Sequence, residues 1–334
     1  MNMKTTGHVV IHEDANRHLA FVGQCKNRAG HLLVVFREGA GHVDPEGRIL
    51  LTRSADGGRT WSKPTCVVDT DLDDRDPSIA ALPSGRLILN YFSSRCTKPW
   101  DEARAQRWGG LCLELGRKNW DATVDHVGLV YSDDDGETWS REIVVTRAGL
   151  ATSEPVCVRQ DGHLLLPVYG KLEGEEFRGS KIFHSSDNGE TWDGPHVIAT
   201  DVSGIVGFEE PSLAQLPDGR LLCHMRSSSS KVDPGAVWQC ESADGGRTWS
   251  TPAKLPLWGY PQSLTRLDHG RVLSVYGYRR YPPGVRAAVS RDGGRTWDPN
   301  DEIVIRHDGV HHDLGYPAAV ALPNGQAFVA YYIN

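Results

Sequence analysis

The sequence predicts an all-β fold, a six-bladed β-propeller that forms a single domain over residues 1–334. Two interleaved repeats carry this prediction. The first is the pattern Ser-x-Asp-x-Gly-x-Thr-Trp, whose five copies begin at Ser54, Ser132, Ser185, Ser242 and Ser290. The tryptophans that end the copies lie 48 to 78 residues apart, a spacing that suits four-stranded blades better than the coils of a solenoid.

Each copy of this pattern predicts a tight turn between two antiparallel strands. The Asp carboxylate can accept backbone N–H bonds, the Gly can adopt a positive φ, and the Trp side chain can pack beneath the hairpin. The repeat therefore marks five hairpins along the chain.

The second repeat predicts the innermost hairpin of each blade. Each copy is a strand, a turn rich in Pro, Asp and Gly, and another strand. Five copies begin at Asp76, Glu154, Glu210, Tyr260 and Tyr316, and a degenerate sixth copy begins at Arg17. The last copy has no Ser-Asp-Thr-Trp turn of its own. We therefore expect residues 8–11 to add an outer strand to the last blade, which closes the ring and leaves no open sheet edge.

Composition favours one soluble domain. The repeats leave no linker, and no apolar run is long enough to cross a membrane. The formal net charge of −7, without a basic stripe, argues against a nucleic-acid partner. Scattered cysteines and a start without an apolar leader predict a cytoplasmic location, or a secreted or periplasmic one if a leader has been removed.

One long insertion covers residues 93–123 in the second predicted blade. It contains three tryptophans and a stretch of mixed charge. Such an insertion could be a lid over a ligand or only a decorated edge.

Functional residues are expected where the innermost strands begin. In a propeller these first residues point into the central funnel, so the equivalent positions of the six copies should converge. The residues there are one cation, three carboxylates and two phenols: Arg17, Asp76, Glu154, Glu210, Tyr260 and Tyr316. A scaffold without a ligand does not need this set, whereas an anionic or polyhydroxylated ligand does.

The turns and inner residues together resemble the bacterial sialidase (neuraminidase) family from end to end of the chain. Members of that family are six-bladed propellers whose turns are known as Asp boxes. The resemblance implies a retaining exo-glycosidase in which Tyr316, within Gly-Tyr-Pro, is the nucleophile and Glu210 is its base. A phenol suits this role because the anomeric carbon of sialic acid carries a carboxylate, which would repel an anionic nucleophile.

The same resemblance implies three arginines that hold the substrate carboxylate. Arg17, Arg226 and Arg286 match the family's positions, although Arg17 lacks the usual Phe-Arg-Ile-Pro context. Guanidinium groups can grip a carboxylate through two parallel hydrogen bonds. The alternative is that each arginine caps a strand or pairs with a carboxylate of its own blade.

The acid/base of the family is an Asp before the first Asp box, and this chain has Arg48 at that position. The nearby segment offers Glu38, His42 and Asp44 as replacements. An imidazole, with an ordinary pKa near ~6.5, can act first as acid and then as base at neutral pH. The alternative for His42 is a hydrogen-bonded loop histidine. The further substrate-binding candidates are Arg37, Glu38, Arg75, Asp76, Glu154 and Tyr260.

The predicted ligand is thus a carbohydrate or glycoconjugate, with a terminal sialic acid or related acidic sugar as substrate. Two alternatives remain open. One is an exo-glycosidase for another sugar, such as a Kdo-like acid, a uronate or a rhamnosyl-uronate end, and the other is a carbohydrate-binding propeller without turnover. No cofactor or metal is expected, because the sequence lacks metal-site spacings and residues 311–313 are interpreted as a polar loop. Asp313, three residues before Tyr316, could still reach the funnel mouth.

Overall fold

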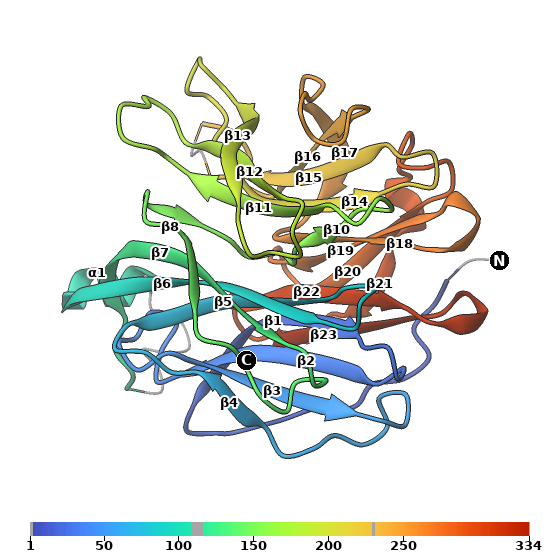
Figure 1. The fold of residues 1–334 in the computed structure, drawn as a ribbon. Helices are drawn as coiled ribbons and strands as arrows, with labels where there is room; N and C mark the ends of the chain where they lie inside the picture. Colours follow the sequence, from blue (N-terminus) through green and yellow to red (C-terminus); the bar gives the residue numbers. More distant parts are fainter. Residues whose placement is uncertain (1–2, 109–115, 229–230, 334) are drawn as a thin grey trace.

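The computed structural model describes residues 3–108, 116–228 and 231–333. Within these ranges the chain is almost entirely β-structure, with one α-helix, α1 (Glu102–Trp108), and three short 3-10 helices. The strands form antiparallel sheets that follow one another in sequence order (Figure 1). The first and last sheets are in contact, because β1 (His18–Lys26) of the first contacts β22 (Leu314–Ala321) of the last.

The strands of the first three sheets are β1 (His18–Lys26), β2 (Leu32–Gly39), β3 (Arg48–Ser54) and β4 (Thr65–Val68); β5 (Asp73–Ala81), β6 (Leu87–Pro99), β7 (Trp120–Ser132) and β8 (Ile143–Thr146); and β9 (Leu150–Ala151), β10 (Cys157–Val158), β11 (Leu164–Gly170), β12 (Gly179–Ser185) and β13 (Asp193–Thr200). The strands of the other three are β14 (Phe208–Gln215), β15 (Leu221–Ser227), β16 (Ala236–Ser242) and β17 (Ala253–Trp258); β18 (Gln262–Arg266), β19 (Val272–Tyr278), β20 (Gly284–Ser290) and β21 (Ile303–Arg306); and β22 (Leu314–Ala321) and β23 (Ala327–Ile333).

The all-β propeller is confirmed, but the prediction of six complete blades closed by an N-terminal strand is wrong. Five sheets have four or five strands and form complete blades, whereas the sheet of β22 and β23 has two strands. Residues 8–11 form no strand. The predicted inner hairpins are nevertheless present, because each sheet contains an antiparallel pair at the predicted place.

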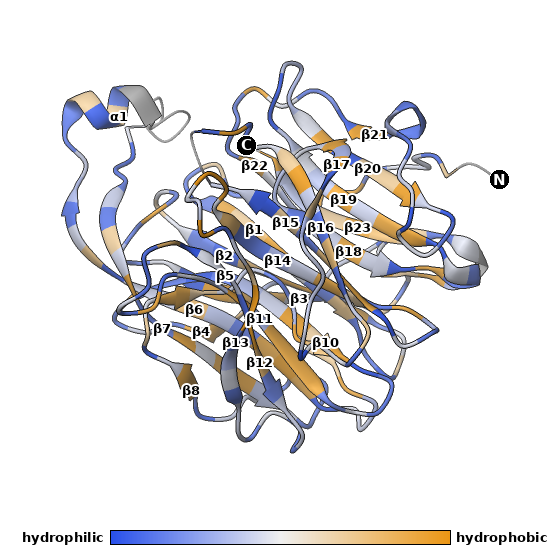
Figure 2. Cartoon of the chain, turned by 90° about the horizontal axis from the view of Figure 1, so that it is seen from above, coloured by the Kyte–Doolittle hydropathy of each residue, from blue (hydrophilic) through white to orange (hydrophobic). Residues whose placement is uncertain are grey.

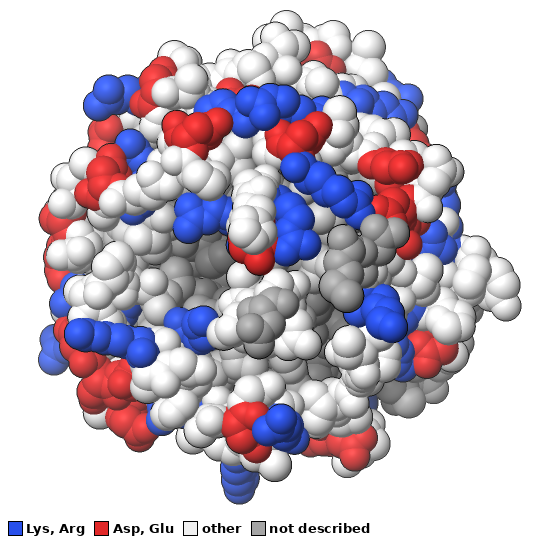
Figure 3. All heavy atoms as spheres, turned by 90° about the vertical axis from the view of Figure 1, so that its right-hand side faces the viewer, with Lys and Arg blue, Asp and Glu red and all other residues white. Residues whose placement is uncertain are grey.

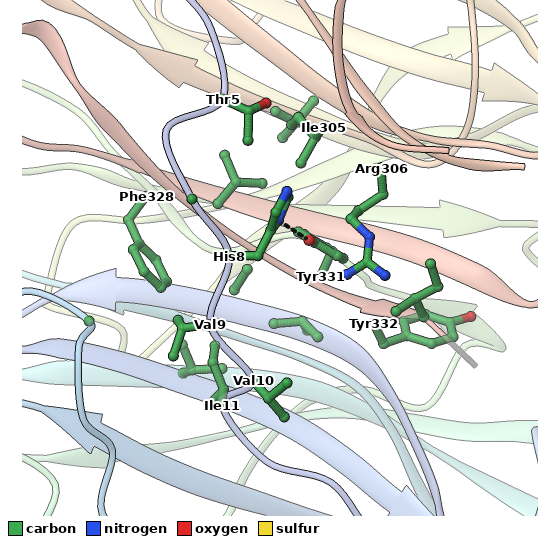
Figure 4. Close-up of a pocket in the computed structure, with 18 of the residues that line it drawn as sticks. Thr5, His8, Val9, Val10, Ile11, Ile305, Arg306, Phe328, Tyr331 and Tyr332 are labelled. Carbon is green, nitrogen blue, oxygen red and sulfur yellow. Dashed lines mark hydrogen bonds between the residues drawn. The ribbon is translucent and has the colours of Figure 1, made fainter. Parts of the chain in front are cut away.

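The N-terminal segment, residues 3–15, runs over the last sheet without pairing with it (Figure 4). Nδ1 of His8 lies 3.0 Å from the hydroxyl of Tyr331, and the hydroxyl of Thr5 donates to the carbonyl of Val304 at 3.3 Å. Met3 packs against an apolar cluster of the last two sheets, and Ile11 packs against a cluster that includes the first. The segment therefore bridges two sheets instead of extending one, and a cavity of about 1490 Å³ remains beneath it.

Apolar residues fill the spaces between consecutive sheets. One cluster joins the first two sheets through residues such as Leu33 and Leu89, and another joins the second and third through Ile88 and Leu166. Figure 2 shows apolar stretches along the strands of several sheets. This packing fixes the positions of the inner strands relative to one another.

The five repeat turns have the geometry that the sequence predicts, each between the third and fourth strands of a blade. In the third blade the Gly189 N–H donates to Oγ of Ser185 at 3.0 Å and the Thr191 N–H donates to Oδ1 of Asp187 at 3.0 Å. Gly189 has a φ of +87°, and the indole N–H of Trp192 donates to its carbonyl at 3.1 Å. The same Gly-to-Ser and Thr-to-Asp bonds occur in the other four turns.

These turns should make the fold sensitive to acid. Hydrogen bonds from Thr138 and Thr191 lower the pKa of Asp134 and Asp187 to about 2. Because the folded-state pKa lies below the ordinary value of 3.8, the stabilisation is present above about pH 4 and is lost as the pH falls toward 2. We expect the free energy of unfolding, measured with urea, to fall over this interval and to fall less in Asp187→Asn. Asp71→Asn, an exposed carboxylate outside the turns, is the control; an unchanged pH dependence in Asp187→Asn would contradict the expectation.

Candidate active site

Four innermost strands direct a side chain to the centre of the molecule at the same kind of bulge. Phe21, Asp76, Glu210 and Tyr316 have φ values of +58°, +47°, +52° and +39°. Each lies in a register shift between the first two strands of its sheet. Positive φ is costly for residues other than glycine, and such residues concentrate at functional sites. The bulges therefore mark a candidate site, the central cluster, formed by Phe21, Asp76, Glu210, Tyr316 and the side chains that contact them.

Three of these four positions were predicted, but on β1 the structure places Phe21 where Arg17 was expected. A proline follows Asp76, Glu210 and Tyr316, and it suits a bulge because it lacks a ladder N–H. On β1 the corresponding residue is Val22. Without the proline, the sequence carried no clear signal for the bulge at Phe21.

Tyr316 and Glu210 are directly bonded within the central cluster. The hydroxyl of Tyr316 donates to Oε1 of Glu210 at 2.7 Å. NH2 of Arg226 donates to the same oxygen at 3.1 Å, and Nε of Arg226 lies 2.6 Å from Oε2. Burial and the neighbouring Glu210 and Asp76 carboxylates hold the pKa of Tyr316 well above its ordinary value. The phenol is therefore neutral and has an adjacent carboxylate as its hydrogen-bond acceptor.

Asp76 and Arg75, consecutive residues of β5, are both buried. Oδ1 of Asp76 accepts no hydrogen bond from any residue that the structure describes. Burial, opposed by Arg75 and reinforced by Glu210, raises the pKa of Asp76 to about 7. The guanidinium of Arg75 lies 5.0 Å from the ring centre of Phe21, and its Nε is 3.9 Å from Oδ1 of Asp76. A buried acid and a buried cation are thus neighbours.

Arg279 is a functional candidate that sequence reasoning missed. Its guanidinium lies 4.6 Å from the ring centre of Tyr260 and 5.9 Å from that of Tyr316. Arg226 lies 5.3 Å from the same Tyr260 ring. NH2 of Arg279 donates to the carbonyl of Leu314 at 3.1 Å, whereas its buried Nε has no hydrogen-bond partner among the described residues. The repeat positions that predicted the other funnel residues do not include Arg279.

Arg17 and Arg286 lie apart from the central cluster. Arg17, with 27% of its side chain exposed, is 3.7 Å from Glu38. NH1 of Arg286 donates to Glu302 at 2.8 Å, and its guanidinium lies 3.4 Å from the ring centre of Tyr278. Arg17 precedes the bulge of β1 by four residues, and Arg286 is on β20, the third strand of its blade. The structure therefore brings together Arg75, Arg226 and Arg279, rather than the predicted set of Arg17, Arg226 and Arg286.

His42 lies beside the central cluster, in the loop between β2 and β3. Nδ1 of His42 is 3.0 Å from Oδ1 of Asp313, and Nε2 of His18 is 2.9 Å from Oδ2 of the same carboxylate. The hydroxyl of Tyr332 also donates to Oδ1, at 2.7 Å. The ring of Phe21 contacts both His42 and Tyr316, with centroids 5.0 Å and 4.9 Å away. Asp313, interpreted from the sequence as part of a polar loop, thus joins two histidines next to the proposed nucleophile.

By residue type, His18, His42 and Asp313 could hold a metal ion, since their ligand atoms lie within 4.8 Å of one another. However, the two imidazoles face different oxygens of the carboxylate at 2.9 and 3.0 Å. Both distances are those of direct hydrogen bonds, and each ring nitrogen has its own carboxylate oxygen as partner. The geometry fits a hydrogen-bonded relay better than a metal centre.

The other candidates in this region support the loop of His42. Nε of Arg37, fully buried, donates to Oδ1 of Asp73 at 2.8 Å, and its NH1 donates to the carbonyl of Gly41 at 2.8 Å. The carboxylate of Asp44 accepts backbone N–H bonds of its own loop, including that of Glu46 at 3.2 Å. These bonds occupy both side chains within the protein. Arg37 and Asp44 therefore have structural partners, and the guanidinium of Arg37 lies 6.0 Å from the ring centre of Phe21.

Glu38 and Glu154 are also held by neighbouring residues. Glu38 accepts hydrogen bonds from Nε and NH2 of Arg48 at 3.0 and 2.7 Å. Oε2 of Glu154 accepts a bond from the hydroxyl of Ser212 at 2.8 Å. Burial raises the pKa of Glu154 to about 8. Glu154 is thus a buried acid behind the central cluster rather than a group displayed to a ligand.

The insertion of residues 93–123 contacts the same loop. It extends β6 and β7 beyond the blade and carries α1 at their ends (Figure 1). Oδ1 of Asn119 accepts the backbone N–H of Val43 at 3.1 Å, next to His42. Residues 109–115, which include Cys112, lie outside the described residues. The described part of the insertion therefore supports the segment that carries His42.

The outer surface is mixed in charge. On the face shown in Figure 3, basic and acidic side chains are interspersed. In the ranges that the structure covers, no helix is long and apolar enough to span a membrane.

Comparison with known proteins agrees with this architecture. The family model of the BNR repeat-like domain matches residues 111–329, more than half of the chain. The chain belongs to this family. The BNR repeat-like chain is 27% identical over 193 residues to the anhydrosialidase of Macrobdella decora, and the alignment covers 52% of this chain and 23% of that protein. It is 28% identical over 217 residues to the sialidase of Paraclostridium sordellii, with coverage of 59% and 48%. The alignments therefore span less than half the length of these two relatives.

Solved structures show the same fold for this BNR repeat-like chain. A protein of unknown function from Dyadobacter fermentans superimposes with a TM-score of 0.82 at 24% identity, covering 98% of this chain and 93% of that one. The leech intramolecular trans-sialidase, complexed with 2,7-anhydro-Neu5Ac, superimposes with a TM-score of 0.67 at 16% identity, covering 98% and 67%. The protein is thus a sialidase-like BNR propeller.

Proposed function

We propose that this propeller is a retaining exo-glycosidase of the sialidase type, which removes a terminal α-linked sialic acid or a related acidic sugar from glycoconjugates. The observation that carries the proposal is the 2.7 Å hydrogen bond from Tyr316 to Glu210. A neutral phenol with a carboxylate acceptor is an activated nucleophile. The named sialidase activities of the sequence relatives support the same reaction class.

The reaction follows from the placement of these groups. The Tyr316 oxygen attacks the anomeric carbon as its proton passes to Glu210, and the bond from that carbon to the leaving oxygen breaks. The leaving oxygen takes the electron pair and a proton from a general acid. Water then attacks the anomeric carbon from the face that the leaving oxygen has vacated and gives a proton to the deprotonated general acid. The phenolic oxygen leaves with its bonding electrons and takes back its proton from Glu210. Two inversions give net retention.

The guanidinium groups of Arg226 and Arg279 are suited to hold an acidic sugar. Both lie against the ring of Tyr260, and Arg279 also lies near Tyr316. A carboxylate on the anomeric carbon would reach both cations while that carbon faces the phenol. Charge-assisted hydrogen bonds of this kind are stronger than those between neutral groups.

This chain has Arg48 at the position of the family's acid/base. For this reason, an exo-glycosidase that acts on another acidic sugar is the alternative function.

To decide between the two functions, purified protein is incubated with aryl glycosides of sialic acid, Kdn, Kdo, glucuronic acid and rhamnose, and aryl alcohol release is followed. Proton NMR of the first-formed sugar gives its anomeric configuration. Release from the sialic acid or Kdn glycoside with retention supports the proposal. Release from another sugar alone supports the alternative, and saturable binding without release on the whole panel indicates a binding propeller.

A matched pair of arginine variants tests the carboxylate site. We expect Arg279→Ala to raise KM for the carboxylated sugar by about 10-fold to 100-fold, because it removes a charge-assisted bond. Arg286→Ala, whose guanidinium is paired with Glu302, should leave KM within about 2-fold. Steady-state kinetics of both variants against a glycoside lacking the carboxylate gives the reference. A larger effect of Arg286→Ala than of Arg279→Ala would restore the set of arginines predicted from the sequence.

A further inference from the structure

We propose that His42 is the general acid and then the general base of this reaction, and that Asp313 positions it. The inference rests on the proposed glycosidase function and deepens it. A retaining glycosidase needs a proton donor for the leaving oxygen, and the residue at the family's acid/base position is Arg48. An arginine stays protonated and cannot exchange a proton at neutral pH. The proton must therefore come from another group near Tyr316.

His42 has the placement that this role requires. Its Nδ1 is bonded to Asp313, and 32% of its side chain is exposed. No described residue accepts or donates a hydrogen bond at its Nε2. Its ring and that of Tyr316 both contact Phe21, so the two groups border one site. One ring nitrogen is thus anchored inside the protein while the other is open to a ligand.

Asp313 fixes the tautomer of His42. Burial opposes ionisation of Asp313, but His42 and His18 outweigh it and hold the pKa of Asp313 well below its ordinary value. The carboxylate therefore accepts the Nδ1–H of His42. The imidazolium carries its second proton on Nε2, where it can be passed to the leaving oxygen. The resulting neutral imidazole has its lone pair on Nε2, where it can remove a proton from water in the second step.

The surroundings of Asp313 keep its carboxylate in place. Burial lowers the pKa of His18, so this histidine is neutral and its Nε2–H donates to Oδ2. Tyr332 donates to Oδ1 from β23. The two oxygens are thereby held by β1, β23 and the loop of His42.

Other charged groups also face His42. Arg75 on β5 donates to the backbone carbonyl of His42 at 2.7 Å, and His312, beside Asp313, interacts with it electrostatically. His18 on β1 lies with its ring centre 5.7 Å away. Arg75 carries a positive charge, and Asp313 is the one described anion bonded to the His42 ring. Removing its charge should therefore destabilise the imidazolium form.

Leaving-group dependence tests the role of His42. The full-length protein, His42→Ala and His42→Gln are compared on two glycosides of the sugar that the panel identifies, one with 4-nitrophenol and one with an alkyl alcohol. A 4-nitrophenolate needs little protonation to leave, whereas an alkoxide needs a full proton. We expect both variants to lose about 10²-fold to 10⁴-fold in kcat/KM on the alkyl glycoside and less than about 10-fold on the nitrophenyl glycoside. His312→Ala, which removes a neighbouring histidine not bonded to Asp313, should retain the ratio of the parent protein.

The pH profile tests the role of Asp313. We expect Asp313→Asn to move the alkaline limb of kcat/KM on the alkyl glycoside to lower pH, because the imidazolium loses its anion. A structural role alone would lower activity equally at every pH. Circular dichroism of each variant monitors folding, and His42→Gln keeps a donor for Asp313 if His42→Ala does not fold.

The outcomes separate this inference from the proposed function. Equal losses on the two glycosides in the His42 variants overturn the inference while Tyr316-dependent turnover keeps the function. Loss of turnover with a chelator, restored by zinc, overturns it in favour of a metal centre at His18, His42 and Asp313. Absence of turnover by the parent protein on every glycoside overturns both.

Discussion

Replacing Tyr316 with phenylalanine is expected to reduce kcat/KM for the acidic-sugar glycoside by about 10³-fold or more, with little change in affinity for the free sugar. The substitution removes one oxygen, the atom that would bond to the anomeric carbon, and keeps the ring that packs against Phe21. It also removes the hydrogen bond to Glu210, whose carboxylate retains Arg226 as a partner. The free energy of unfolding should therefore change by only about 1 to 3 kcal/mol.

The measurement is steady-state kinetics combined with calorimetric titration of the free sugar. Tyr131→Phe, on β7 and away from the central cluster, is the control for loss of a tyrosine hydroxyl and should keep the parent kcat/KM. Turnover by Tyr316→Phe within about 10-fold of the parent would exclude the phenol as nucleophile. Sugar binding by both proteins, with turnover by neither, would identify a binding propeller.

The repeats were sufficient to predict the propeller and its turns. The reason is that each turn is encoded locally: Ser185, Asp187, Gly189 and Thr191 bond to one another within a few residues. The number of complete blades was not encoded locally. Whether residues 8–11 pair with β23 depends on the packing of Met3 and Ile11 against separate clusters, and the repeat pattern contains no information about that packing.

Some residues of the candidate site could be predicted from local sequence patterns, and others could not. Asp76, Glu210 and Tyr316 were predicted because a proline follows each one and marks the bulge of its inner strand. Arg279 was missed because it follows β19 directly and reaches the centre from the end of the second strand, a position outside the repeat. Arg286 has a position in the repeat, but on β20 its side chain is paired with Glu302.

The hydrogen-bonded group around His42 shows why residue type and spacing were not sufficient to predict the whole site. His18, His42 and Asp313 come from β1, the loop after β2 and the residue before β22, so only the contact between the first and last sheets brings them together. In sequence, His18 and Asp313 are 295 residues apart. Their association therefore follows from the fold and has no local motif.

Replacing Glu154 with glutamine should make the protein more stable at pH 8 and should change its stability little at pH 5. Glu154 is buried and accepts a hydrogen bond from Ser212, and burial raises its pKa to about 8. Its folded-state pKa thus lies above the ordinary value of 4.5. A raised acid pKa gives stability that is fully present below the unfolded pKa and is lost as the pH rises through the folded pKa. For Glu154 this loss amounts to roughly 4 to 5 kcal/mol between pH 4.5 and 8.

Urea unfolding of the parent and Glu154→Gln from pH 5 to pH 8 measures the effect. The parent should lose stability over this interval, with Asp76 contributing in the same direction because its pKa is about 7. Glu154→Gln should lose less, since the neutral amide can still accept the Ser212 bond and has no proton to release. Glu137→Gln, with 67% of its side chain exposed, is the control and should follow the parent. If Glu154→Gln also follows the parent, the ionised Glu154 must be solvated in the folded state, and its carboxylate would then be open to a ligand, as the sequence first indicated.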